Sequence, residues 1–293
     1  MAAGPVPLPA QPRGRLRGRP RTGAPVSPAR PAPTLDTETE LARDGARFVA
    51  GMDEVGRGAL AGPASVGLVV LDVPVLLGPS PDDAARTGTA HTSGSPRPAV
   101  PPGLRAASPA PGRADRTPAR PWEGVRDSKA LSAARREALA PGIGEWAVAT
   151  AVGHAQPAEI DELGITAALR LAGLRALDAV RRAGARVDAL ILDGSHNWLD
   201  AAPVLGQEEA PVELPLVVRT LVKADVACVS VAAASILAKV ERDALMTRLA
   251  AAHPQYDWAS NKGYGSASHR AALLEHGVTA QHRRSWNLGV RPS

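Results

Sequence analysis

The chain has 293 residues and a formal charge of +5, and its 28 Gly and 28 Pro stand against five Trp, two Tyr and one Phe. Proline crowds into residues 5–33 and 79–121, where few large apolar side chains offset the entropy of ordering the backbone. We expect both stretches to be disordered and to contribute nothing to a core. The remaining residues, about 210, suffice for one α/β domain of ordinary size.

The composition also excludes several classes of protein. The single cysteine, Cys228, rules out a disulfide framework and a cysteine-rich zinc site, and it fits a reducing compartment, so we expect a cytoplasmic protein. No run approaches the roughly 20 apolar residues that a membrane helix needs. The N-terminus also lacks the apolar region of a signal peptide.

The positive charge is concentrated at the start of the chain. Residues 1–34 hold six arginines and no acid, so they carry +6 and leave the other 259 residues at −1. A polyanion must therefore bind the domain through a local groove, with the tail adding at most diffuse, salt-sensitive attraction. The simpler interpretation of the tail is a solvated spacer or a mis-assigned start codon. We place the tail at residues 1–44 and the domain at residues 45–293.

The first half of the domain predicts two strands and a long interruption. Residues 47–52 form an apolar run that leads into the charged, Gly-rich loop 53–58, and residues 64–73 form a second strand. The Pro-, Ser- and Ala-rich residues 74–121 are interpreted as an insertion. A structureless connection of this length is unusual inside a compact domain, so it is either a flexible surface loop or a sign that the strand prediction is wrong.

In the second half, strands alternate with helices. Ser132 can cap a helix that we expect to end near Leu139, just before Pro141-Gly142. This alternation describes a mixed sheet covered by helices, an α/β fold. The later strands are predicted at residues 146–152, 187–192 and 216–222, and the later helices at 157–163, 165–182, 229–252 and 266–276.

Four carboxylates stand next to predicted apolar strands: Asp53 and Glu54, Asp193, and Asp225. Loops at strand ends converge in α/β sheets, and carboxylates that meet there repel one another unless a cation neutralises them. An all-oxygen set, with no cysteine pair and no helically spaced histidine pair, favours Mg²⁺ or Mn²⁺ over zinc. Taken singly, acids at strand ends are more often caps and surface turns.

The adjacency of Asp53 and Glu54 raises a geometric difficulty, because neighbours on a regular strand point to opposite faces. Both can serve one site only if the strand breaks there, which Gly56 and Gly58 would allow. The same glycines let backbone N–H groups approach a ligand closely, and Arg57 between them can meet an anion.

A series of motifs resembles that of the ribonuclease HII family. Their order and spacing agree from about Phe48 to Trp286, except across the insertion, and the Gly-Arg-Gly form around Arg57 favours type HII over the related type HIII. The motifs are residues 53–58 (DEVGRG), 127–129 (DSK), 159–161 (EID), 192–194 (LDG), 223–225 (KAD), 232–243 (AAASILAKVERD) and 262–265 (KGYG).

The resemblance implies a ribonuclease H-like mixed β-sheet flanked by helices, with a small C-terminal helical extension. It also implies a metal-dependent endoribonuclease that cleaves the RNA strand of RNA/DNA hybrids and nicks 5′ of single ribonucleotides embedded in duplex DNA. The metal-binding catalytic residues would be Asp53, Glu54, Asp193 and Asp225, and the ribonucleotide and its junction with DNA would be read by Gly56, Arg57, Gly58 and Tyr264.

The chemistry behind this assignment can be stated independently. Two metals about 3.5–4 Å apart can activate a water, clamp a nonbridging oxygen and neutralise the departing 3′ oxygen. Distinguishing RNA from DNA requires a partner for the 2′-OH. The backbone of residues 56–58 and the Tyr264 hydroxyl are suitable, and the Tyr264 ring can stack on the next deoxyribose. Lys129 stands where it can contact a backbone phosphate.

Two other functions stay open. A nuclease that cuts only continuous hybrids would result if Gly265, where many relatives have Pro, loosens the segment around Tyr264. A non-catalytic hybrid-binding protein tethered by its Arg-rich tail belongs to a different class. For each of the three functions we expect a monomer.

The remaining polar residues receive structural interpretations. We expect Lys239 to pair with Asp243 one helical turn away. Residues 283–286 could contact a duplex, and an equally good prediction is that Arg283 and Arg284 are solvated beside a Trp286 that covers the edge of the core. The histidines at 269, 276 and 282 are spaced too irregularly for a closed metal site and are predicted to be structural or superficial.

Overall fold

The protein is described here by a computed structural model that covers residues 31–78, 120–200, 214–215 and 217–290. Residues 32 onward form the unit that contains every helix and strand below. The predicted tail at residues 1–30 and most of the predicted insertion, residues 79–119, lie outside the described residues.

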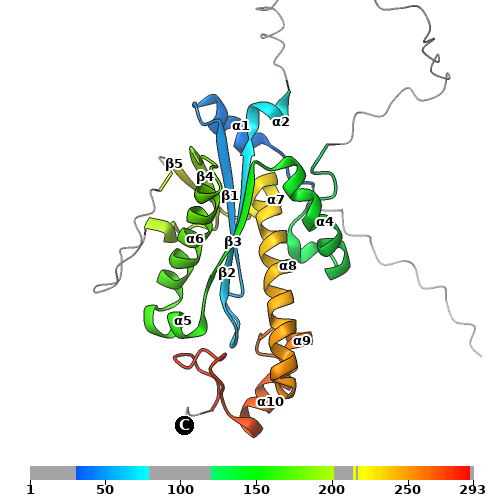
Figure 1. Ribbon diagram of the computed structural model, residues 1–293, viewed down its shortest axis with the longest axis vertical. Coiled ribbons are helices and arrows are strands. Elements are labelled where there is room, and N and C mark those ends of the chain that lie inside the picture. Colours follow the sequence, from blue (N-terminus) through cyan, green and yellow to red (C-terminus); the bar gives the residue numbers. More distant parts are fainter. Residues whose placement is uncertain (1–30, 79–119, 201–213, 216, 291–293) are drawn as a thin grey trace, which may run out of the picture. The chain divides into compact units, whose positions relative to one another are not determined.

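A five-stranded mixed sheet forms the centre of this unit, with the strand order β3-β2-β1-β4-β5 (Figure 1). The three strands β3, β2 and β1 pair antiparallel, and β1, β4 and β5 pair parallel. This confirms the predicted mixed sheet. The strands are β1 (Phe48–Val55), β2 (Ala64–Asp72), β3 (Ala149–Ala155), β4 (Ala189–Asp193) and β5 (Val217–Leu221).

Helices cover both faces of the sheet. Figure 1 shows α6 (Ile165–Arg182) on one side and the long α8 (Val229–Ala252) on the other. The α8 face carries small residues where the helix crosses the strands: a Cβ at Gly51 would lie 2.3 Å from the backbone carbon of Ser230, and one at Gly67 would lie 2.2 Å from the carbonyl oxygen of Ala234. Because Gly51 and Gly67 have no side chain, α8 packs directly on the sheet, and this close packing fixes the distance between α8 and β1.

The shorter helices complete the fold around these layers. Beside α8 lies α4, and a C-terminal group of short helices forms its own small core around Tyr256, Trp258 and Leu273, as the predicted helical extension requires. No helix in the described parts of the chain is long and apolar enough to cross a membrane. The bounds are α1 (Asp36–Arg43), α2 (Val73–Leu77), α4 (Ala133–Trp146), α5 (Pro157–Leu163), α7 (Ala224–Ala227), α9 (Trp258–Asn261) and α10 (Ala267–His276), with 3₁₀ turns at Ser128–Ala130, Trp198–Asp200 and Pro254–Tyr256.

The predicted boundary of the tail at residue 44 is wrong. Residues 36–43 form α1, which buries Leu41, and the preceding Leu35 is buried as well. The side chain of Glu38 accepts hydrogen bonds from Ser230 N at 2.9 Å and Ser230 Oγ at 2.7 Å. A carboxylate placed there satisfies an N–H group in the first turn of α8 and complements the helix dipole. Helix α1 therefore belongs to the folded domain.

Two other predicted boundaries also need correction. Ser132 does cap α4, accepting from Arg135 N at 3.3 Å, but the helix continues through Pro141 to Trp146. Proline costs one intrahelical hydrogen bond there, and the burial of Ile143 in the core on the α8 side offsets that loss. The predicted insertion also begins too early, since residues 73–77 form α2.

Candidate active site

The fold brings three of the four predicted acids to one end of the parallel strands. Met52 of β1 and Leu192 of β4 are paired across the two parallel strands. The residues that follow them, Asp53 and Asp193, therefore lie at the same end of adjacent strands. Asp193 Oδ1 accepts a hydrogen bond of 2.7 Å from Ala224 N, which joins the end of β4 to the start of α7. Helix α7 carries Asp225, which is 5% exposed. The predicted convergence of strand ends is thus present in the structure.

Glu54 joins this group without the predicted break in the strand. β1 continues to Val55, with Asp53 opposite Gly67 and Glu54 opposite Val66. Strand alternation therefore places Asp53 on the α8 face with Gly51, and Glu54 on the other face. The expectation of a break is wrong: the two acids lie on opposite faces near the end of the strand, and the charge of Asp193 acts on both of them.

Burial and mutual repulsion raise the pKa values of these acids. Desolvation, with smaller contributions from Glu54, Asp193 and Asp225, raises the pKa of Asp53 to about 8, against the opposing effect of a hydrogen bond from Ser235. Desolvation is also the main cause of the raised pKa of Glu54 and of Asp225, and Asp193 adds repulsion to both. Acids arranged in this way are poised to accept a cation.

Arg57 Nη1 lies 3.5 Å from Glu54 Oε1, and a second cationic side chain that pairs with the acids is that of Lys129. Its Nζ lies 3.8 Å from Asp225 Oδ2. Desolvation lowers the pKa of Lys129, but the attraction of Asp53, Asp225, Asp127 and Asp193 outweighs it, so the pKa is raised overall. The side chain remains 78% exposed, and its charge is therefore accessible to a ligand as well as to the acids.

The oxygen ligands at this site suit a hard divalent cation, although the side chains are not arranged around a cation. In the described part of the chain, no three His, Cys, Asp or Glu side chains are arranged to hold a metal ion. The acids instead interact with Ser235, Lys129, Arg57 and the Ala224 N–H. All the acid donors are carboxylate oxygens, the ligands that Mg²⁺ and Mn²⁺ prefer, and a cation would relieve the repulsion that raises their pKa values.

The predicted ribonucleotide-binding residues lie together. Gly56 has a φ of 79°, in the left-handed region, and its N–H donates to the Tyr264 hydroxyl at 3.2 Å. The Tyr264 ring centroid lies 5.4 Å from the guanidinium carbon of Arg242, and the side chain is partly exposed. Nothing lies within 4 Å of a Cβ placed on Gly58. The loop at residues 56–58 and the segment around Tyr264 therefore form one surface.

Comparison with known proteins decides the family. The family model for Ribonuclease HII matches residues 120–288. The Ribonuclease HII of Streptomyces avermitilis is 42% identical over 255 residues, which cover 87% of this chain and 83% of that protein. The Ribonuclease HII of Paracoccus denitrificans is 38% identical over 257 residues, covering 87% of this chain and 91% of that protein. The chain belongs to the ribonuclease HII family. It is accordingly a nuclease, and its family supports ribonuclease H activity on RNA/DNA hybrids.

Solved structures agree with the fold of this chain. The crystal structure of ribonuclease H2 from Pyrococcus horikoshii matches with a TM-score of 0.52 at 23% identity, covering 82% of this chain and 94% of that one. The structure of Bst-RNase HIII in complex with Mn²⁺ matches with a TM-score of 0.50 at 20% identity, covering 83% of this chain and 68% of that one. The predicted ribonuclease H-like sheet is confirmed.

Sequence reasoning missed two arginines beneath the surface formed by residues 56–58 and Tyr264. Arg242 and Arg283 are both fully buried, so the prediction that Arg283 is solvated is wrong. Arg242 donates to the carbonyl oxygens of Pro63, Ala61 and Lys262 at 2.9 to 3.2 Å. Arg242 lies in the motif at residues 232–243, but the sequence did not predict that its side chain is buried, because the carbonyl groups it contacts come from distant parts of the chain.

The other structural interpretations can now be tested. The predicted pair is present, with Lys239 Nζ 2.8 Å from Asp243 Oδ1. Trp286 packs at the edge of the core as predicted, and Arg284 is exposed. His269 and His282 are buried and hydrogen bonded to each other, which confirms a structural role for this pair.

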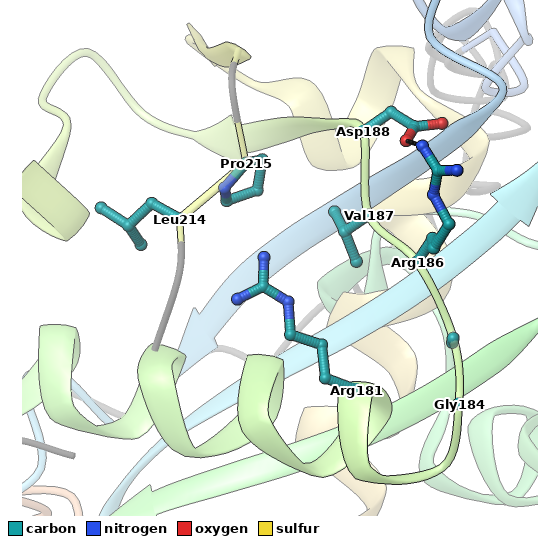
Figure 2. Close-up of a pocket in the computed structure, with 8 residues that line it drawn as sticks. Arg181, Gly184, Arg186, Val187, Asp188, Leu214 and Pro215 are labelled. Atoms are coloured by element: carbon teal, nitrogen blue, oxygen red, sulfur yellow. Dashed lines mark hydrogen bonds and ion pairs between the residues drawn. The ribbon is translucent and has the colours of Figure 1, made fainter. Parts of the chain in front are cut away.

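A separate pocket lies at the opposite end of β4 from Asp193. It has a volume of about 470 Å³, and its lining includes Arg181 and Arg186 (Figure 2). Arg186 is paired with Asp188 at 2.9 Å, and Asp188 also accepts from the backbone N–H groups of Arg47 and Phe48. That carboxylate is engaged in holding the start of the strands, and the pocket contributes no acid to the cluster described above.

Proposed function

We propose that this enzyme cleaves the RNA strand of RNA/DNA hybrids and nicks 5′ of single ribonucleotides embedded in duplex DNA. The contact between Gly56 N–H and the Tyr264 hydroxyl, beside the acids, is the observation that carries the proposal. It couples a backbone loop that can approach a sugar with an aromatic ring that can stack on one. Both belong to a surface next to Asp53 and Glu54, where β1 ends.

We assign the catalysis to Asp53, Glu54, Asp193 and Asp225 as holders of divalent cations, with Mg²⁺ or Mn²⁺ as the ion. When bound, a pair of such ions supplies an activated water and stabilises the charge that develops on the phosphate, which gives 3′-OH and 5′-phosphate ends. The buried acids contribute by excluding water and by presenting only oxygen ligands. Lys129, exposed and 3.8 Å from Asp225, contacts the neighbouring phosphate.

Recognition of the ribonucleotide uses the surface at residues 56–58 and Tyr264. The Tyr264 hydroxyl accepts from Gly56 N, which leaves its own O–H as a donor for a 2′-OH. Its partly exposed ring stacks on the following deoxyribose, where an additional hydroxyl would clash. Arg57, whose side chain is 59% exposed, meets a phosphate oxygen.

The packing around Gly265 favours this reading over a nuclease restricted to continuous hybrids. A Cβ on Gly265 would lie 3.0 Å from Arg270 Nη2 and 3.1 Å from Leu60 Cδ1, so the segment is closely packed. The carbonyl of Tyr264 is also held by His269 Nδ1 at 2.9 Å. Absence of proline therefore does not leave Tyr264 loosely placed.

The test uses the purified protein with Mg²⁺ or Mn²⁺ and three duplexes: one with a single embedded ribonucleotide, one continuous RNA/DNA hybrid and one of DNA alone. We expect nicking of the first two, none of the third, and no cleavage in EDTA. Asp53→Asn and Asp225→Asn should abolish nicking while the melting curve stays cooperative. Equal cutting of ribonucleotide-containing and all-DNA duplexes would refute the specificity. We further expect the active species to be a monomer in the cytoplasm.

A further inference from the structure

The segment formed by residues 282–285 lies between the two parts of the ribonucleotide-binding surface. Arg283 Nη2 donates to the carbonyl oxygen of Gly56 at 2.6 Å and to that of Gly62 at 3.1 Å, and Nη1 donates to the carbonyl oxygen of Arg57 at 2.7 Å. The side chain is fully buried, and none of the ion pairs in the described residues includes it. A buried guanidinium whose N–H groups donate to carbonyl oxygens fixes the orientation of the peptide groups around it.

This arrangement orients the loop. In a planar trans peptide the C=O and N–H point in opposite directions. The carbonyls of Gly56 and Arg57 face Arg283, so the N–H groups of Arg57 and Gly58 face away from it. Neither N–H has an acceptor within the described residues. Arg283 thereby turns two backbone donors outward, at residues 57 and 58, which are exposed.

The residue before Arg283 reaches the other part of the same surface. His282 and His269 share a hydrogen bond of 3.1 Å between their Nε2 atoms. Nδ1 of His282 accepts from Thr279 N at 2.9 Å, so Nε2 of His282 carries the hydrogen. His269 Nε2 is then the acceptor, and it also accepts from Trp258 Nε1 at 3.1 Å, while Nδ1 of His269 donates to the Tyr264 carbonyl at 2.9 Å. Hydrogen bonds therefore connect residue 282 to Tyr264 through His269, whose Nε2 lone pair is shared with Trp258.

The residues after Arg283 anchor the segment to the sheet domain. Asp161, on α5, accepts from Arg284 N at 2.8 Å, from Ser285 N at 2.9 Å and from Ser285 Oγ at 2.6 Å. In Figure 1 the C-terminal segment passes next to α5. The segment is consequently held at one end by α5 and contacts both the loop at residues 56–58 and the support of Tyr264.

We propose that Arg283 is a positioning residue for junction recognition, which sets the outward N–H groups of residues 57 and 58 at a fixed distance from Tyr264. This rests on the proposed function of that surface. Lysine cannot replace Arg283, because a single ammonium lacks the planar fork that reaches three carbonyls at once. None of the hydrogen bonds of Arg283 involves the acids, although the side chain of Arg57 pairs with Glu54 at 3.5 Å. Loss of these hydrogen bonds should therefore weaken recognition of a lone ribonucleotide much more than bond cleavage itself.

The experiment compares Arg283→Lys with Arg284→Lys, its neighbour, whose side chain is exposed. For each protein, kcat/KM is measured on a duplex with one embedded ribonucleotide and on a continuous RNA/DNA hybrid, and the ratio is taken. A hybrid offers a 2′-OH in every register, so we expect Arg283→Lys to lower the ratio about tenfold or more through misplacement of the loop. Arg284→Lys should leave the ratio unchanged.

Asp161→Asn gives a second test that leaves the buried guanidinium in place. The substitution weakens the hydrogen bonds that Asp161 accepts from residues 284 and 285. It should lower the same ratio of kcat/KM values to a smaller extent. An unchanged ratio in folded Arg283→Lys, or in Asp161→Asn where Arg283→Lys does not fold, overturns the inference. Failure of the wild-type protein to nick the single-ribonucleotide duplex would instead refute the proposed function, so the two failures are distinguishable.

Discussion

Gly56 N–H donates to the hydroxyl of Tyr264 at 3.2 Å, although the two residues are 208 positions apart. This contact joins the first motif of the sequence to one of the last. It makes the surface proposed to bind the ribonucleotide a product of tertiary structure, because neither partner can form it alone.

Tyr264→Phe should lower kcat/KM on a single-ribonucleotide duplex about fivefold to tenfold, because the variant keeps the stacking ring and loses one hydrogen-bonding hydroxyl. Cleavage of a continuous hybrid should change less. Tyr256→Phe is the matched control: its hydroxyl bonds the Gly277 carbonyl at 2.9 Å inside the C-terminal core. If both variants reduced the two activities in the same proportion, Tyr264 would have no special role at the junction.

Asp53→Asn should change how stability depends on pH in metal-free protein. The pKa of Asp53 is about 8 in the folded protein and 3.8 ordinarily, so the folded state binds this proton more tightly than the unfolded state. Its stabilising effect is complete at acid pH and is lost as pH rises through about 8. The Tm of the variant relative to wild type should therefore rise between about pH 4 and about pH 8 and stay constant above that.

Melting curves in EDTA measure this difference, with Glu137→Gln on the exposed face of α4 as control. The control should track the wild-type protein at every pH. A constant difference in Tm between Asp53→Asn and wild type would contradict burial of an acid with a raised pKa.

Protonation of His282 should destabilise the folded protein at acid pH. Desolvation, with repulsion from His269 and His253, lowers its pKa to about 4, below the ordinary 6.5. A histidine with a lowered folded pKa contributes stability above about pH 6.5, and this is lost as pH falls toward about 4. His282→Gln should be less stable than wild type at neutral pH and should show a shallower fall. His276→Gln, at a more exposed histidine, should retain the wild-type pH profile.

Gly51→Ala should destabilise the domain by about 2 kcal/mol or more, because its Cβ would lie 2.3 Å from backbone atoms of α8 and neither element can yield. Gly142→Ala is the control, since it lies in α4 with nothing within 4 Å of its Cβ. That change should be neutral or stabilise by up to about 1 kcal/mol. Urea denaturation measures both, and similar free energies of unfolding for the two variants would refute the close approach of α8 to β1.

The sequence predicted the elements whose periodicity is long and regular. The bounds of α5, α6 and α8 agree with the predicted ranges, because each helix has an apolar stripe or clear end signals. The meeting of Asp53, Asp193 and Asp225 was likewise predictable, since parallel strands end at one edge.

Other features depend on tertiary contacts that a local pattern does not contain. Helix α1 is short and polar, and only the spacing of Leu35, Glu38 and Leu41 marks its buried face. Pro141 predicts the end of a helix, whereas α4 continues beyond it because its neighbour Ile143 packs in the core. Arg283 reads as solvated because charge normally predicts exposure, and its carbonyl partners lie more than 200 residues earlier in the sequence.

The attachment of α1 has a practical consequence for shortening this protein. Thr34 pairs with Cys228 as an isolated bridge, and four positions later Glu38 serves as the missing cap of the longest helix. Removing the arginine-rich leader by starting the chain at residue 45 would expose the first turn of α8 and leave its N–H groups without an acceptor. A trimmed enzyme that begins upstream of Thr34 would keep this carboxylate and shed most of the basic charge.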